Sequence, residues 1–266
     1  MPPNFTGLWK RKSIQIGDSE PYEDATVLWL QAKTYFADIR IPFNQPSLPP
    51  GQSLLSLNRS ELLKFSEFKA FAGTIDAAES WIRWNRQIDF QPSPKRIDQG
   101  KVYFEDGNLI EVGEFLLSGS VQPYLEVWVP QPVDTSDYLV LELIQEVNQV
   151  TQITQPRALA VAVGEHFVRV YDNRGYPAEF EAPDPAHLSA TDLQKLMQFQ
   201  VDYGKCTGEM NSWQILLSND PNRIGMSPHQ GMGYQSRWQD EVFIETWKTA
   251  TGENLEHHWQ VREGSV

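Results

Sequence analysis

The segment LLKFSEFKAFAG, residues 62–73, recurs later in the chain as LQKLMQFQVDYG, residues 193–204. Four of the twelve aligned positions are identical, where ordinary composition gives roughly one chance match in twenty. The same shift of 131 residues places Phe36 on Phe167. Because such landmarks keep their order, we predict that the chain is one β-rich unit of about 130 residues written twice.

The repeat extends toward the carboxyl end after a shortening of the second copy. Residues 124–128, YLEVW, then align with residues 243–247, FIETW. This alignment predicts that Glu245 repeats Glu126. The alternative interpretation is that a similar order of strands and helices produces similar residues without a duplication.

Hydrophobic residues alternate with polar ones through most of each copy, which is the period of β-strands. In Ser80 to Phe90, for example, Ile82, Trp84, Ile88 and Phe90 are expected to share one face. Helical spacing is found in one segment per copy, residues 60–68 and 189–203. Strands are predicted at residues 8–16, 26–31, 34–41, 80–90, 100–105, 108–113, 124–129, 138–147, 157–164, 166–172, 213–218, 241–249 and 255–262.

Many short strands with about one helix per copy predict an all-β fold of two antiparallel β-barrels in tandem. A flat sandwich is the competing all-β solution. We expect each copy to enclose its own apolar core, and an eight-stranded barrel either fills its lumen with side chains or holds one small ligand. The predicted domains are residues 1–130 and 138–266. Residues 131–137 are polar, contain proline and are predicted to be a linker.

Charge and composition exclude several classes of partner. Lys and Arg total 22 against 35 Asp and Glu, which gives a formal net charge of −13. A nucleic acid or an anionic membrane requires clustered positive charge, so we predict neither as a partner. The single cysteine, Cys206, cannot form an intramolecular disulfide. The first residues lack a secretory pattern, and we predict a soluble cytoplasmic protein.

Three short segments of the first copy resemble a known family. They are FAGT at residues 71–74, LIEVG at 109–113 and YLEVWVP at 124–130, followed by Asp134. In order and spacing they are similar to a small fungal family of calycin-like proteins known through interaction with a casein-kinase-one homologue. The resemblance covers residues 65–135. It implies two lipocalin-like barrels in tandem, a kinase or other protein as partner, and no catalytic residues.

A wider similarity is to the lipocalins, whose amino-terminal Gly-x-Trp matches Gly7-Leu8-Trp9. In that family the tryptophan closes the floor of the barrel, which implies a structural role for Trp9.

Charged residues among apolar strand neighbours are the candidate site. Arg86 shares the predicted apolar face of its strand with Trp84, while Glu111 and Glu126 lie in the strands that close the first copy. A luminal pair of Arg86 with Glu126 or Glu111 would orient a polar ligand group, and Arg40 is placed in the same way. Alternatively, these carboxylates lie on the solvated outer face or form ordinary cross-strand ion pairs. We favour this second, structural interpretation.

No phosphate loop, nucleophile motif or metal-ligand spacing is present in the sequence, so we predict no metal and no cofactor. The leading hypothesis is a non-enzymatic protein, monomeric or homodimeric, that binds a small apolar or aromatic ligand or a protein partner. Its predicted ligand-binding residues are Trp84, Arg86, Glu126 and Arg40. The alternative is an isomerase, hydratase or lyase with Glu126 or Glu111 as general acid or base and Arg86 stabilising an anion.

Overall fold

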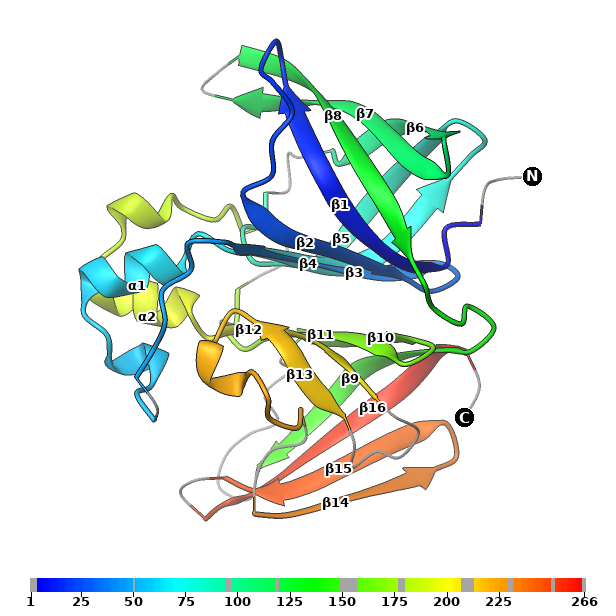
Figure 1. Ribbon diagram of the computed structural model, residues 1–266. Helices are drawn as coiled ribbons and strands as arrows, with labels where there is room; N and C mark the ends of the chain where they lie inside the picture. The colour runs from blue at the N-terminus through cyan, green and yellow to red at the C-terminus, as the bar shows by residue number, and fades with distance from the viewer. Residues whose placement is uncertain are drawn as a thin grey trace.

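The computed structural model describes residues 4–49, 51–93, 97–117, 120–148, 157–176, 180–206, 213–228, 232–249 and 252–264. These residues form an all-β protein with two short α-helices (Figure 1). The elements are β1 (Gly7–Ile16), β2 (Ala25–Gln31), β3 (Tyr35–Pro42), η1 (Leu54–Ser56), α1 (Arg59–Phe65), β4 (Lys69–Ala77), β5 (Trp81–Asp89), β6 (Gln99–Glu105), β7 (Asn108–Leu117), β8 (Ser120–Gln131), β9 (Tyr138–Asn148), β10 (Arg157–Val163), β11 (His166–Asp172), η2 (Pro185–His187), α2 (Ala190–Leu196), β12 (Phe199–Lys205), β13 (Gln214–Ser218), η4 (Pro221–Arg223), β14 (Met232–Gln239), β15 (Val242–Lys248) and β16 (Asn254–Gly264). The predicted all-β fold class is confirmed.

The first unit, β1–β8, is a closed antiparallel barrel. Each strand pairs with the next, and β8 returns to pair with β1. The hairpin between β6 and β7 turns at Asp106 and Gly107, whose φ angles of 49° and 80° are the left-handed values that such a turn requires. Closure leaves this unit without exposed sheet edges.

The second unit, β9–β16, is an eight-stranded antiparallel sheet in the order β13-β12-β11-β10-β9-β16-β15-β14. It is a half-barrel, because no pairing among the described residues joins β13 to β14. The outer side of β13 is taken by a nearby segment: the amide of Ile215 donates to the carbonyl of Met226 at 2.9 Å, and the amide of Gly225 donates to the carbonyl of Ile215 at 2.8 Å. The expectation of a closed second barrel is therefore corrected.

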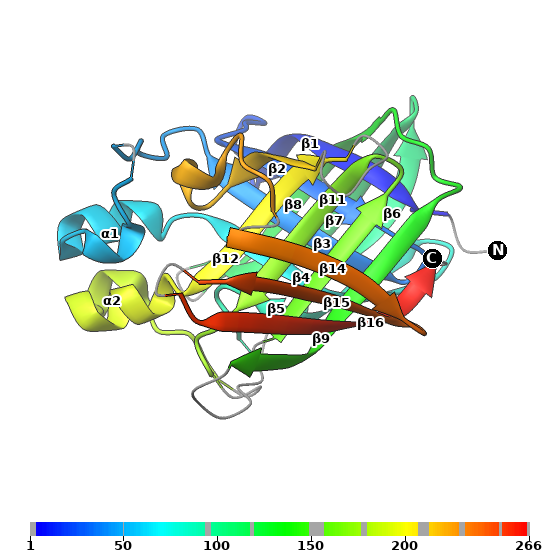
Figure 2. The same cartoon turned by 90° about the horizontal axis from the view of Figure 1, so that it is seen from below.

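The two helices follow the same order in both units and lie side by side at one end of the molecule (Figure 2). α1 begins with a capping box, in which the Asn58 side chain accepts from the Glu61 amide and the Glu61 side chain accepts from the Asn58 amide. α2 is capped by Ser189. The second helix is shorter than predicted: residues 199–205 form β12, since Phe199 and Val201 alternate with polar residues along a strand.

Each unit has an apolar cluster of its own, as expected, but the largest cluster lies between the two units and was not expected. The outer face of β1–β4, the facing surface of β9–β12 and both helices supply its side chains, among them Leu30, Ile39, Leu62, Val161 and Leu193. All five are buried. Burial of this surface couples the two units into one folded body.

Arg174 ties the second unit to the end of β5. Its guanidinium donates to the carbonyl oxygens of Phe90 and Asp89 at 2.6 and 2.7 Å, and to the Asp172 carboxylate at 2.8 Å. Burial opposes ionisation of Asp172, but Arg174 holds the pKa of that carboxyl below its usual value.

A bulge in β4 and β5 divides the apolar face predicted for residues 80–90. Register shifts between Ala72 and Gly73, so Trp84 points into the barrel lumen while Ile88 belongs to the cluster between the units. A Cβ at Gly73 would lie 2.0 Å from the Asn85 carbonyl oxygen, so glycine is required there. One strand thereby serves two cores.

Candidate functional site

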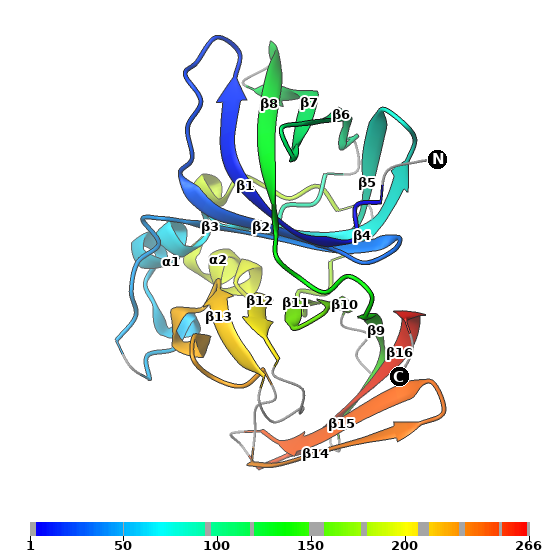
Figure 3. The ribbon, with the colours of Figure 1, turned by 45° about the vertical axis from the view of Figure 1, so that its right-hand side comes forward.

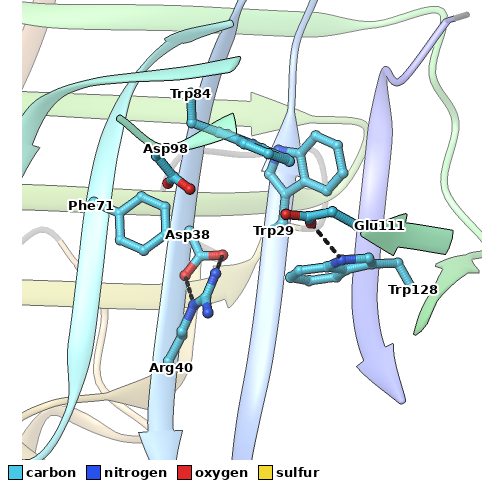
Figure 4. A pocket seen from close by; sticks show the side chains of 8 residues that line it. All are labelled: Trp29, Asp38, Arg40, Phe71, Trp84, Asp98, Glu111 and Trp128. Carbon is cyan, nitrogen blue, oxygen red and sulfur yellow. Dashed lines mark hydrogen bonds and ion pairs between the residues drawn. The ribbon is translucent and has the colours of Figure 1, made fainter. Parts of the chain in front are cut away.

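The lumen of the closed barrel contains an aromatic cluster with charged groups beside it. Trp9, Trp29, Trp84 and Trp128 are buried there with Phe71. Trp29 is central, with ring centroids 5.9 Å from Trp9, 5.7 Å from Trp84 and 5.8 Å from Trp128. The side chains leave a cavity of about 20 Å³ (Figure 4), which has room for about one water molecule.

Arg40 comes from β3 and points into this lumen. Its guanidinium donates to Asp38 at 2.7 Å and lies 3.6 Å from Glu126. It also lies over the rings of Phe71 and Trp128, at 5.1 and 6.0 Å from their centroids. Burial alone would lower the pKa of Arg40, but Asp38 and Glu126 reverse this and raise it, so the side chain is a permanent cation.

Glu126, from β8, is held by a second arginine from the neighbouring strand. Arg11 donates to Glu126 at 2.6 Å and to Glu23 at 2.8 Å. All three side chains are at most 15% exposed. The favoured structural interpretation offered a solvated face or a cross-strand ion pair. The solvated face is wrong, because Glu126 and Glu111 are both 4% exposed and face the lumen, whereas Glu126 does form an ion pair with Arg11 on the neighbouring strand.

The functional interpretation expected Arg86 to pair with Glu126 or Glu111. It pairs with neither of these luminal glutamates. It binds Asp98 at 2.5 Å and Asp89 at 3.1 Å, and its guanidinium lies 3.5 Å from the centroid of Phe71. The bulge beside Gly73 explains part of this arrangement, because it brings Asp89 back to the luminal side next to Arg86.

Glu111, from β7, is held by uncharged donors. The Tyr124 hydroxyl donates to it at 2.6 Å and the Trp128 indole at 3.1 Å. Burial, with added repulsion from Glu126, raises the pKa of Glu111 well above its usual value. Gly113 makes room for this arrangement, since a Cβ there would lie 2.5 Å from the Tyr124 hydroxyl.

The structure thus brings the five predicted residues Trp84, Arg86, Glu126, Arg40 and Glu111 into one lumen. Sequence reasoning missed the groups that neutralise them, which are Arg11, Glu23, Asp89, Asp98 and Tyr124. The alternation in β1 offered a signal for Arg11, whereas Asp98 precedes β6 in a loop and had none. A raised carboxyl pKa is an ingredient of acid–base catalysis. The cavity of about 20 Å³ nevertheless holds nothing larger than water, so it does not support the enzymatic alternative.

The second unit places different side chains at the equivalent register positions. Trp259 donates from its indole to Glu245 at 2.7 Å, as Trp128 does to Glu111. The counterpart of Glu245 is therefore Glu111, and the predicted match of Glu245 with Glu126 is wrong. The error arose because the motif YLEVW lies in β8, while its supposed repeat lies in β15, the partner of β16.

Within the described ranges no three His, Cys, Asp or Glu side chains gather as metal ligands. No described helix is long and apolar enough to cross a membrane.

These features define an all-β protein of two eight-stranded antiparallel units, one closed around a filled lumen and one open. The chain belongs to the protein HRI1 family, whose family model matches residues 7–210. The matched region contains the closed barrel and extends through β12. No curated protein and no solved structure matched the chain.

Proposed function

We propose that the protein is a non-enzymatic interaction protein that binds a protein partner on the outer face of β5–β8. This face lies on the side of the barrel away from the second unit (Figure 3). The observation that carries the proposal is the apolar character of this face.

Outward-pointing apolar side chains form neighbouring rows across these strands. Tyr103 pairs with Ile110, which pairs with Val127. In the next row Trp81 pairs with Lys101, which pairs with Val112. Trp81 and Tyr103 remain 41% and 48% exposed. Two large, half-exposed aromatic side chains beside aliphatic neighbours are typical of protein-binding surfaces.

The opposite side of the barrel supports this interpretation. The outer face of an antiparallel sheet that meets water is normally polar. On β1–β4 the outer face is apolar, with Leu30 and Ile39 as examples, and there the second unit covers it. The outer face of β5–β8 also carries apolar side chains, and Trp81 and Tyr103 on it remain 41% and 48% exposed, so this face suits a partner as well.

Basic residues lie on and beside this face although the whole chain has a net charge of −13. Lys10, Arg83 and Lys101 are exposed, and within the described ranges none of them forms an ion pair. A partner with an apolar centre and an acidic border would complement this arrangement. A flat anionic membrane fits less well, because it would also meet the acidic remainder of the molecule.

The family resemblance implies a casein-kinase-one homologue as the partner to test first. With the purified kinase on a biosensor surface, we expect wild-type protein to bind and the double variant Trp81→Ala, Tyr103→Ala to bind at least about tenfold more weakly. Ile144→Ala is the matched control, since Ile144 is 43% exposed on the second unit. Unchanged affinity of the double variant would contradict the proposed face, and no binding of the wild type would contradict the kinase as partner.

A further inference from the structure

The open second unit carries small side chains where the closed barrel is filled. Trp29 pairs with Asp38 in the first unit, and Ala160 pairs with Arg169 at the equivalent place in the second. Trp29 is 1% exposed, whereas Ala160 remains half-buried. The neighbouring position, Trp9 in the first unit, is taken by Leu141, which is also half-buried.

Two polar atoms on this concave face have no partner. Among the buried side-chain nitrogen and oxygen atoms of the described residues, only Nε of Arg169 and Nδ1 of His257 make no hydrogen bond. His257 is 3% exposed. Both side chains adjoin Trp259: the Arg169 guanidinium lies 4.8 Å and the His257 ring 5.9 Å from its centroid. Buried groups of this kind are normally satisfied, so each needs a partner that the protein does not supply.

The other contacts of the site define the kind of partner. Nε of Arg169 is always a donor. The Glu146 carboxylate accepts from the Tyr171 hydroxyl at 2.5 Å and lies 2.7 Å from Nε2 of His257, so Nε2 carries the hydrogen. Burial lowers the pKa of His257 and Arg169 lowers it further; the hydrogen bond to Glu146 acts in the opposite direction, but the pKa remains below its usual value. The ring is therefore neutral, and with the hydrogen on Nε2 its Nδ1 atom is an acceptor.

The charges on this face do not favour an anion. Arg169 lies 3.7 Å from Glu245, and Glu146 is buried beside His257. Two carboxylates against one guanidinium would repel a further negative group. A neutral group that offers one acceptor and one donor fits these two atoms best.

We propose that the concave face of the second unit binds a neutral small molecule through an amide group. Its carbonyl oxygen accepts from Nε of Arg169, its N–H donates to Nδ1 of His257, and its apolar body lies toward Ala160 and Leu141. This site is independent of the protein-binding face on β5–β8.

Benzamide and cyclohexanecarboxamide are suitable probes, with benzoate as the anionic analogue of the same shape. Binding to the full chain is measured by saturation-transfer NMR and tryptophan fluorescence. We expect both amides to bind more tightly than benzoate. Ala160→Trp, which restores the bulk found in the closed barrel, and Arg169→Gln should each weaken amide binding at least about tenfold. Arg262→Gln, an exposed change on the same sheet, should leave it unchanged.

Two variants keep the test decisive if one of them fails to fold. The proposal is overturned if neither amide binds and a crystal structure shows only a water molecule between Nε of Arg169 and Nδ1 of His257. It is equally overturned if amide binding survives both Ala160→Trp and Arg169→Gln. Tighter binding of benzoate than of benzamide would overturn the assignment of a neutral ligand.

Discussion

The lumen of the closed barrel and the concave face of the second unit are two versions of one arrangement. Register places Arg169 of the second unit where the first has Asp38, and Tyr171 where it has Arg40. In the closed barrel the arginine lies between two carboxylates, Asp38 and Glu126. In the second unit the arginine therefore lies two positions earlier along the strand than Arg40 does in the first, and the Nε atom of Arg169 has no hydrogen-bond partner. The two units thus differ at a few register positions in whether the luminal arginine has all its hydrogen-bond partners within the protein.

One element is retained in both units, the pair of an indole and a carboxylate. Trp128 and Trp259 each donate to a glutamate on the adjacent strand, at 3.1 and 2.7 Å. A buried carboxylate needs such donors wherever it lies, whether or not the sheet closes. The difference between the units therefore lies in bulk and in charge placement, and each can be tested separately.

Changes in side-chain volume are expected to have the largest effect on the free energy of unfolding. Trp29→Ala should lower the free energy of unfolding by about 3–5 kcal/mol, because the ring is fully buried and its loss leaves a cavity. The reverse change in the second unit, Ala160→Trp, should cost less than about 1 kcal/mol, below the 1–3 kcal/mol typical of overpacking. Urea unfolding followed by far-UV circular dichroism measures both. Equal destabilisation by the two changes would show that the second concave face is filled.

Charge placement gives the next largest effect. Arg40→Met leaves the buried Asp38 without its cation and should cost about 3 kcal/mol, the lower end of the range for a broken buried pair, since Arg11 still neutralises Glu126. Arg169→Met should cost only about 1 kcal/mol, because its contact with the buried Glu245 is long, at 3.7 Å, and Glu245 keeps the Trp259 indole as a donor. Thermal unfolding of the two variants at one pH is the measurement. A larger loss of stability in Arg169→Met than in Arg40→Met would contradict this difference between the two units.

The fold followed from the sequence further than the site did. Alternation predicted most of the strands, because a half-buried strand has apolar residues at every second position. It did not predict β4 or β14, and residues 199–203 of β12 were assigned to a helix. Alternation also predicted one continuous apolar face for residues 80–90, and the bulge at Gly73 divides that face between two cores. Whether Glu111 is inside or outside depends on partners far along the chain, such as Tyr124, and a local pattern carries no such information. The open edge of the second unit likewise depends on the segment that pairs with Ile215.

A shared backbone constraint should give similar, smaller effects in both units. A Cβ at Gly73 would lie 2.0 Å from the carbonyl oxygen of Asn85, and one at Gly204 would lie 2.0 Å from that of Gln214. Gly73→Ala and Gly204→Ala should each cost about 2 kcal/mol as the paired strands separate. Gly107→Ala is not a suitable control, because the φ angle of Gly107 is positive. Ala186→Gly is the control, since Ala186 lies in η2, outside both sheets. The register shifts at both glycines, between Ala72 and Gly73 and between Tyr203 and Gly204. A neutral effect at one glycine only would mean that these two bulges are not equivalent.

The smallest effect is a pH dependence confined to the closed barrel, where Glu111 faces a second carboxylate, Glu126. In the second unit Glu245 pairs instead with His257 across the same two strand positions. Burial and this repulsion raise the pKa of Glu111, so the folded protein keeps a proton that the unfolded chain releases near pH 4.5. The stabilisation is complete below that pH and is lost as the pH rises through the folded pKa.

Glu111→Gln imitates the protonated side chain and removes this dependence. The stability of the variant relative to wild type should therefore increase between pH 5 and pH 8, by about 1 kcal/mol or more, with a slope that one proton limits to about 1.4 kcal/mol per pH unit. Urea unfolding of both proteins at the two pH values measures the difference. Glu105→Gln, an exposed change on β6, serves as the control. A difference that stays constant with pH would mean that Glu111 is ionised in the folded barrel, and the contrast between the two lumens would then rest on bulk and on the arginines alone.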